Sequence, residues 1–375
     1  MTIFVGASLF MIWWMWVAGP QTVWKIMTYD SSSISDFTKF PTRKLTSSTN
    51  PFQFEENKEH KNLELIHFSE IGEKSLDQFL QETDTVAFLL IKDDRILSEQ
   101  YFHDYDQSSQ SLAFSMSKSF LSILIGMAID DGRMTSVDDV VTKYVPELSD
   151  EGFDTVTIEH LLQMTSGMNY VETEGNPLSR HDRFYYTNRL EAEILKLNLA
   201  AEPGETFSYK SGENALLGLI LSRAISPQTI TSYTQEKLWE PLGMENDGAW
   251  NLDRPGGLEK TWCCLSATAR DFAKLGRLYL EKGNWNGEQL ISSEWIAQST
   301  RKDTSNASAW NYQYQWWLIS ESTSDFTAMG HLGQFVYVNP DLKIIIVRLG
   351  NSRGGLDWEQ WKTALSEIAL AFDTH

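Results

Sequence analysis

The sequence contains few cysteines and no run of basic residues. Its two cysteines, Cys263 and Cys264, are adjacent. Adjacent cysteines rarely form a disulfide and two thiols alone make a poor metal site, so we interpret both as small apolar residues and expect no metal centre. The sequence has 31 basic and 51 acidic residues, and the net charge of −20 argues against a nucleic-acid partner and favours a soluble, self-repelling surface.

Charged side chains are absent from the first 24 residues, and residues 3–18 are nearly all apolar. A helix over residues 1–24 would extend roughly 35 Å, which suffices to cross a hydrocarbon core of about 30 Å. We therefore expect an inner-membrane signal anchor or a cleaved signal peptide. No Lys or Arg precedes this segment and several follow it, so the positive-inside rule favours a cytoplasmic domain.

Beyond this segment the sequence divides into a linker and one domain. Residues 25–62 are rich in Ser, Thr, Asn and charge, which predicts a flexible tether. Within the remaining residues 63–375, residues 85–102 predict a β-hairpin around an Asp-Asp turn. Helical patterns follow over 115–129, 157–164, 190–197, 215–224 and 233–238. Strand patterns return over 313–320, 334–340 and 343–350, before an amphipathic helix over 355–372. Because short turns join the late strands, we predict antiparallel pairing and an α+β fold.

Ser115 and Lys118 stand at the start of a helical run that is apolar around most of its girth, as in a buried helix. Residues three apart share a helix face, and burial favours a neutral amine that can act as a base towards the hydroxyl. The alternative is a simple N-cap serine with an outward-pointing lysine. A second Ser-x-x-Lys, Ser299 to Lys302, lies among polar residues, and we expect it to be solvated at a helix end.

Two further segments carry candidate chemistry. Tyr209 and Ser211 precede an apolar helix, where a phenol can relay protons, although a packing tyrosine is the commoner reading. His331, Gly333 and Gln334 stand at the start of a strand, where glycine lets a backbone N–H approach a ligand closely. Alone, this segment is equally typical of a turn with an incidental histidine.

In this order and spacing the three segments resemble the serine β-lactamase and penicillin-binding-protein superfamily, over roughly residues 63–371. That family carries Ser-x-x-Lys, then Tyr-x-Asn in class C β-lactamases, then Lys-Thr-Gly. The corresponding segments here are Ser115-Met-Ser-Lys118, Tyr209-Lys-Ser211 and His331-Leu-Gly333. Phrases such as "EPGETFSY" and "SATARDFAKLGRLYL" resemble the esterase and nylon-oligomer (6-aminohexanoate-dimer) hydrolase branch more closely. Without the Asn and the Lys of the second and third motifs, true β-lactamase or transpeptidase activity is not expected.

The resemblance implies a β-lactamase/transpeptidase-like fold, in which an antiparallel sheet is flanked by helices and a helical subdomain is inserted, here at about residues 131–250. It implies that Ser115 attacks a carbonyl carbon to form an acyl-enzyme, with Lys118 and Tyr209 as general base and acid. Backbone N–H groups of Ser115 and Gln334 would form the oxyanion hole.

The same resemblance implies a small-molecule ester or amide substrate and no cofactor. Substrate would be bound by Ser211, His331, Gly333 and Tyr170, although Tyr170 is equally readable as a core or surface aromatic. His160 and His181 receive no role. Two alternatives stay open: a β-lactamase or D-alanyl-D-alanine carboxypeptidase, and a membrane-tethered binding or sensor module without turnover. The resemblance also implies a periplasmic catalytic domain, opposite to the orientation that the charges favour.

Overall fold

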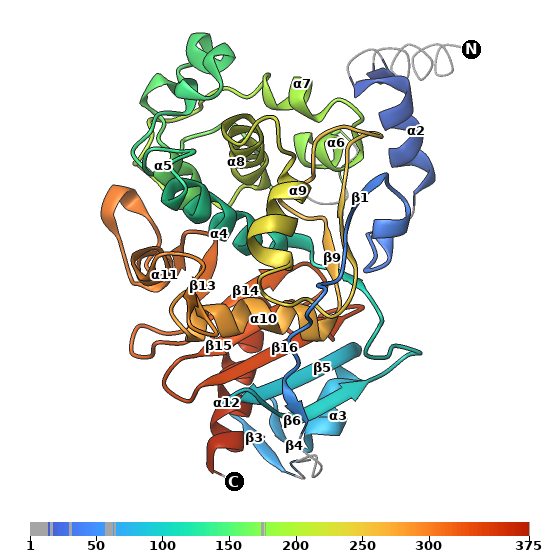
Figure 1. The fold of residues 1–375 in the computed structure, drawn as a ribbon. Coiled ribbons are helices and arrows are strands. Elements are labelled where there is room, and N and C mark those ends of the chain that lie inside the picture. The colour runs from blue at the N-terminus through green and yellow to red at the C-terminus, as the bar shows by residue number, and fades with distance from the viewer. Residues whose placement is uncertain are drawn as a thin grey trace, which may run out of the picture.

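The computed structural model describes residues 14–15, 18–29, 32–56, 63, 65–173, 176 and 178–374. An eight-stranded sheet forms one half of the molecule (Figure 1). In spatial order its strands are β12 (Tyr312–Gln313), β13 (Trp316–Leu318), β14 (Phe326–Gly330), β15 (Gln334–Asn339), β16 (Ile344–Gly350), β5 (Thr85–Lys92), β6 (Arg95–Tyr101) and β2 (Glu55–Glu56). All neighbours pair antiparallel except β2, which runs parallel to β6.

Helices cover both faces of this sheet. On one face α12 (Trp358–Thr374) and α3 (Leu76–Glu82) share an apolar cluster with β5, β15 and β16. On the other face α10 (Ala269–Leu280) contacts β5, β15 and β16, and α4 (Ser117–Asp130) contacts β14. Central strands such as β16 are therefore buried along their whole length, which explains their unbroken apolar sequence.

The other half of the molecule is helical. Between α4 and β8 (Gly248–Asn251) the described residues form helices, 3₁₀ turns and two isolated bridges. The helices are α5 (Ile158–Leu162), α6 (Arg180–Tyr186), α7 (Leu190–Ile194), α8 (Ser211–Ala224) and α9 (Ile230–Thr234). Buried α4 and α8 pack together, and α4 lies between this half and the sheet (Figure 1).

Smaller elements complete the described fold. A second sheet has the order β1 (Thr42–Leu45), β8, β9 (Leu265–Ala267) and β7 (Ser111–Leu112). Two short pairs are β3 (Ile66–Phe68) with β4 (Gly72–Lys74), and β10 (Asn284–Trp285) with β11 (Glu288–Gln289). The remaining helices are α2 (Pro20–Thr28) and α11 (Ser293–Thr300).

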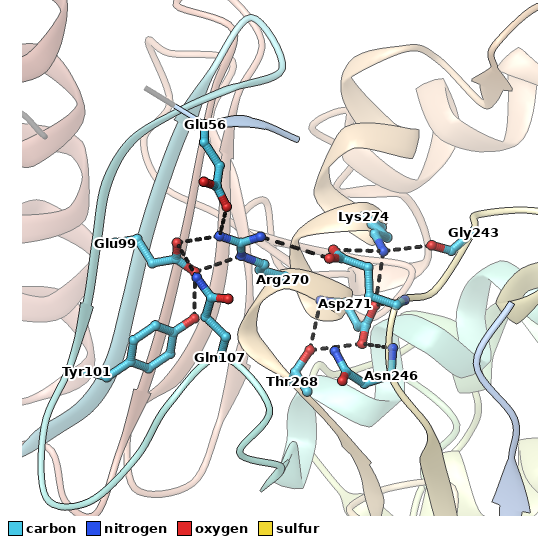
Figure 2. Close-up of polar contacts among 11 residues, drawn as sticks. Glu56, Glu99, Tyr101, Gln107, Gly243, Asn246, Thr268, Arg270, Asp271 and Lys274 are labelled. Atoms are coloured by element: carbon cyan, nitrogen blue, oxygen red, sulfur yellow. Dashed lines mark hydrogen bonds and ion pairs between the residues drawn. The ribbon is translucent and has the colours of Figure 1, made fainter. Parts of the chain in front are cut away.

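A buried polar network ties the N-terminal hairpin to α10 (Figure 2). The Arg270 guanidinium donates to both carboxylate oxygens of Glu99 at 2.8 and 2.6 Å, and to Glu56 at 3.1 Å. One turn further along α10, the Lys274 amine donates to Asp271 at 3.0 Å and to the Gly243 carbonyl at 2.7 Å. Because each buried charge has a partner, α10 can carry four charged residues on faces packed inside the protein.

Residues 32–56, predicted to be part of a flexible tether, are packed against the domain. β1 pairs antiparallel with β8 from Thr42↔Asn251 to Leu45↔Gly248, and Phe40, Leu45 and Phe54 are buried in the main core. The tether prediction is therefore wrong for this stretch. Its composition is mostly polar, but its few apolar residues are buried against the domain, and β1 pairs with a strand that lies far away in the sequence.

The N-terminal segment lies mostly outside the described residues, so its anchoring and orientation stay predictions. Of its second half, α2 packs against α6 with Val23 buried and Trp24 exposed. Among the described residues, no helix is both long and apolar enough to span a bilayer.

Candidate active site

Ser115 lies in a 3₁₀ turn, Phe114–Met116, immediately before α4. The helix therefore begins two residues later than predicted, and Ser115 is not its N-cap. Phe114 has φ of +47°, a left-handed conformation that is uncommon for a bulky residue and recurs at functional sites. Strand β14 approaches this turn so closely that a side chain at Gly330 would clash with the Ala113 carbonyl oxygen.

Lys118 lies in the first turn of α4 and points back at Ser115. Its amine is 2.7 Å from the Ser115 hydroxyl oxygen and donates to the Trp262 carbonyl at 3.1 Å. Lys118 is 1% exposed, so the amine lies in the wall of the site beneath the serine. A buried amine in contact with a hydroxyl can accept its proton when neutral, which is the arrangement of an activated nucleophile.

Tyr209 approaches the same amine from the segment before α8. The Lys118 amine lies 4.9 Å from the centre of the Tyr209 ring. Tyr312 and Trp317 hold that ring from the sheet side, with ring centres 5.8 and 5.7 Å away. Ser115, Lys118 and Tyr209 come from two parts of the chain that are far apart in sequence, and the packing of α4 against α8 brings them together.

A carboxylate that the sequence analysis missed stands beside the serine of the second motif. Ser211 donates to Glu172 through its hydroxyl at 2.5 Å and through its backbone N–H at 2.7 Å. His181 Nδ1 lies 3.4 Å from Glu172 and 3.3 Å from the Tyr170 hydroxyl. Burial would raise the pKa of Glu172, but its hydrogen bond with His181 and the charge of Lys118 outweigh burial and hold the pKa at about 2. Glu172 is therefore ionised at neutral pH.

The third motif forms the turn between β14 and β15. His331 packs edge-on against Phe114, with ring centres 5.3 Å apart, and Gly333 has φ of +80°. Gln334 begins β15 and is fully buried, and its side-chain amide donates to the His331 carbonyl at 3.2 Å and the Gly350 carbonyl at 2.7 Å. His331 reaches the surface of the site, whereas Gly333 and Gln334 support the turn from behind.

Two neighbouring cavities meet at Ser115. The first, of about 330 Å³, is lined by Ser32, Phe114, Ser115, Glu172, His181, Asp182, Tyr185, Tyr186, Ser211, Trp262, Cys263 and His331. The second, of about 310 Å³, is lined by Ser115, Glu172, Tyr209, Trp317, Met329, Gly330, His331, Trp358 and Glu359. A substrate centred on Ser115 thus has room on two sides, and both sides combine aromatic side chains with acidic and other polar groups.

Five of the predicted residues line this cleft or contact Ser115 directly: Ser115, Lys118, Tyr209, Ser211 and His331. Tyr170 does not line either cavity; it is 5% exposed and sits in the wall, where its hydroxyl meets His181. His181, which received no role from sequence, lines the first cavity. His160 instead completes a capping box at the start of α5, which agrees with the absence of a site role.

The prediction for the cysteines is wrong: Cys263 and Cys264 are joined by a disulfide. Consecutive side chains diverge in an extended chain, but here the chain turns before β9, and the Cys264 N–H donates back to the Lys260 carbonyl at 3.1 Å. Cys263 lines the first cavity, so the disulfide belongs to the wall of the site. Among the described residues, no group of three or more His, Cys, Asp or Glu side chains is arranged to hold a metal ion.

A Ser-Lys pair in a cleft between an antiparallel sheet and a helical half defines the class of β-lactamase- and penicillin-binding-protein-like hydrolases. The chain belongs to the β-lactamase family, whose sequence pattern it matches over residues 73–370. A 6-aminohexanoate-dimer hydrolase from Paenarthrobacter ureafaciens is 28% identical in an alignment 317 positions long that covers 79% of each chain.

Solved structures agree on the fold. A Bacillus anthracis protein named provisionally as a 6-aminohexanoate-dimer hydrolase superposes with a TM-score of 0.80 at 21% identity, covering 95% of both chains. A family VIII carboxylesterase superposes with a TM-score of 0.61 at 16% identity, covering 78% of this chain and 94% of its own. The fold class predicted from sequence is therefore confirmed, and the protein is an enzyme of a hydrolase family.

Proposed function

We propose that this protein hydrolyses a small ester or amide through an acyl-enzyme on Ser115. One observation carries the proposal: the buried Lys118 amine lies 2.7 Å from the Ser115 hydroxyl oxygen, at the junction of two cavities. A serine is a weak nucleophile until a positioned base removes its proton, and this amine is in place to do so.

In the first half of the reaction, Ser115 Oγ attacks the carbonyl carbon while its proton passes to Lys118. Tyr209, beside the same amine, protonates the leaving alcohol or amine as the carbonyl–heteroatom bond breaks. In the second half, a water loses its proton to the Lys118–Tyr209 pair, attacks the acyl carbon and releases the acid, and the proton returns to Ser115 Oγ. No step requires a metal or an organic cofactor.

The negative charge on the carbonyl oxygen needs backbone donors. The Ser115 N–H, at the start of the α4 region, is one candidate, and the other comes from the turn that follows β14. The predicted donor Gln334 is fully buried behind that turn, whereas His331 lines both cavities. We therefore favour the His331 end of the turn as the second donor.

Charges around Ser115 favour a substrate without a carboxylate at this point. Glu172 lines both cavities and is ionised, because its pKa is held at about 2. In the carboxylate-binding members of the superfamily that this chain resembles, the third motif begins with Lys. In this chain the corresponding residue is His331. Bringing a substrate carboxylate beside Glu172 costs free energy, since like charges repel in a partly buried site. We therefore infer neutral esters or amides.

The two alternatives make different predictions. A β-lactamase or D-alanyl-D-alanine carboxypeptidase must accept a carboxylate beside Glu172, and a non-turnover sensor would acylate once and stop. Steady-state hydrolysis of a short-chain nitrophenyl ester by the full chain, with the same assay on a chromogenic cephalosporin, separates all three. We expect sustained ester turnover and slow cephalosporin turnover. A single burst would support the sensor, and a strong cephalosporin preference would support the β-lactamase.

A further inference from the structure

In sequence, the Cys263–Cys264 disulfide lies between two residues that form hydrogen bonds with the turn and helix start that carry Ser115 and Lys118. On its N-terminal side, the Trp262 carbonyl accepts from the Lys118 amine at 3.1 Å. On its C-terminal side, the Leu265 N–H donates to the Ser117 hydroxyl at 3.1 Å, and the Leu265 carbonyl accepts from the Ala113 N–H at 2.8 Å. In sequence, the two cysteines are thus the residues between Trp262, which binds the Lys118 amine, and Leu265, which binds the residues on both sides of Ser115.

From this placement we propose that the disulfide is a positioning element for Lys118, and that its reduction by a dithiol lowers the rate of acylation reversibly. The inference rests on the proposed function of the Ser115–Lys118 pair. The disulfide does not touch the reacting atoms; it acts through the Trp262 carbonyl.

The physical reason is the loss of backbone freedom. A bond between adjacent side chains closes a small ring that includes the peptide between them, so the torsions of both residues are restricted. Without the ring, the backbone torsions of both cysteines regain freedom, and the Trp262 carbonyl is held less firmly against the amine. Rates are sensitive to such shifts, because a misplacement of about 1 Å in a reacting group can cost about 10²-fold.

Reduction is chemically accessible from the first cavity. Cys263 lines that cavity and is 5% exposed, whereas Cys264 is fully buried. A thiolate of the dithiol attacks Cys263 Sγ, and Cys264 leaves as a thiolate. The second thiol of the reagent then attacks the mixed disulfide and releases Cys263. The reagent becomes a disulfide and gives up two electrons and two protons, which end as the two cysteine thiols.

The test compares oxidised and reduced full-length protein in one preparation. Thiol titration of the denatured chain should find none of its two cysteines free before treatment with dithiothreitol, and both free after it. Reduction should lower kcat/KM for a nitrophenyl ester at least about tenfold, with KM changed less than about twofold and the pH profile of kcat altered. Removal of the reductant and reoxidation should restore the original rate.

The double variant Cys263→Ser/Cys264→Ser provides the matched control. It should have the lower rate of the reduced wild type and should not respond to dithiothreitol. Because turnover itself is proposed, a second readout is independent of it: in protein labelled with ¹³Cε-lysine, the Lys118 resonance, assigned with Lys118→Arg, should move on reduction. An inactive oxidised enzyme whose Lys118 resonance still moves would overturn the proposed function but keep the positioning of Lys118 by the disulfide. Free thiols in the oxidised protein, or complete reduction with unchanged rate and resonance, would overturn the inference.

Discussion

Two copies of Ser-x-x-Lys, with identical spacing, occupy different environments in this chain. Ser115 lies just before α4 and Lys118 lies in its first turn, so the helical backbone places the Lys118 amine beside the Ser115 hydroxyl. Ser299 lies in the last turn of α11, which ends at Thr300, and Lys302 follows the end of the helix. The amine of Lys302 consequently interacts with Glu321 instead.

The comparison corrects our expectation for the second copy. Ser299 is not solvated: it is fully buried, and its hydroxyl donates to the Ile296 carbonyl at 3.1 Å. The lysines differ instead, since Lys118 is 1% exposed and the Lys302 side chain is 40% exposed. A buried serine hydroxyl needs only a hydrogen-bond partner, whereas a buried lysine is costly unless its charge is paired or its amine is neutral. The lysine is therefore the residue that distinguishes the proposed catalytic pair from the second copy.

The largest expected effect concerns the two serines. A fluorophosphonate probe should label Ser115, and Ser115→Ala should not be labelled. The rate of ester turnover should fall at least about 10³-fold in this variant, because no other nucleophile replaces the serine. Ser299→Ala is the matched control and should keep both. Peptide mapping locates the label; a label on any other residue would contradict the assignment of the nucleophile.

The next effect concerns the two lysines. Lys118→Ala and Tyr209→Phe should each reduce kcat by about 10²-fold, the usual range for the loss of a positioned acid or base. The double variant should be little worse than either single variant, because the two side chains share one proton path. Lys302→Ala, the counterpart in the second copy, should leave kcat unchanged. Multiplicative losses in the double variant would show that Lys118 and Tyr209 act separately.

A third, smaller effect concerns Glu172, the ionised carboxylate that lines both cavities at Ser115. Glu172→Gln should raise the ratio of kcat/KM for a cephalosporin to that for a neutral ester by about tenfold, because it removes like-charge repulsion near Ser115. Glu359→Gln is a suitable control, since Glu359 lines the second cavity but its side chain is 72% exposed and its charge is screened. Equal changes in both variants would show that the charge of Glu172 does not determine the selectivity.

Local sequence patterns predicted the hairpin over 85–102 and the last helix, which the structure has as β5–β6 and α12. They missed β14, which is only five residues long and ends in glycine, and α10, whose inward-facing charges conceal a buried helix. Pairing between β1 and β8 joins residues about 200 positions apart, and no local pattern encodes it.

The candidate site likewise contains residues that local sequence patterns could predict and residues that they could not. The three motifs are local, and each could be found from its own neighbours. Glu172 could not, because it meets Ser211 only after a 39-residue segment folds back onto α8. His181 begins to line the cavity only when α6 packs beside the site. Contacts of this kind depend on tertiary packing, and nothing in the sequence distinguished His181 from His160, the other histidine that received no role.

The last prediction concerns stability and not activity, and it tests how burial changes the pKa of a carboxyl group in α8, the helix that packs against α4. Glu213, in the first turn of α8, is fully buried, and burial raises its pKa to about 8, against the opposing charge of Lys210. The unfolded chain releases this proton near pH 4.5 and the folded chain keeps it until about pH 8, so the wild type loses stability as pH rises through this window. Glu213→Gln cannot titrate, and its free energy of unfolding relative to the wild type should increase by about 3–4 kcal/mol between pH 5 and pH 8. Urea denaturation at the two pH values measures this, with Glu294→Gln on the exposed side of α11 as the control that should show no such gain. A gap that stays constant with pH would mean that Glu213 is ionised in the folded protein and that Lys210 neutralises it.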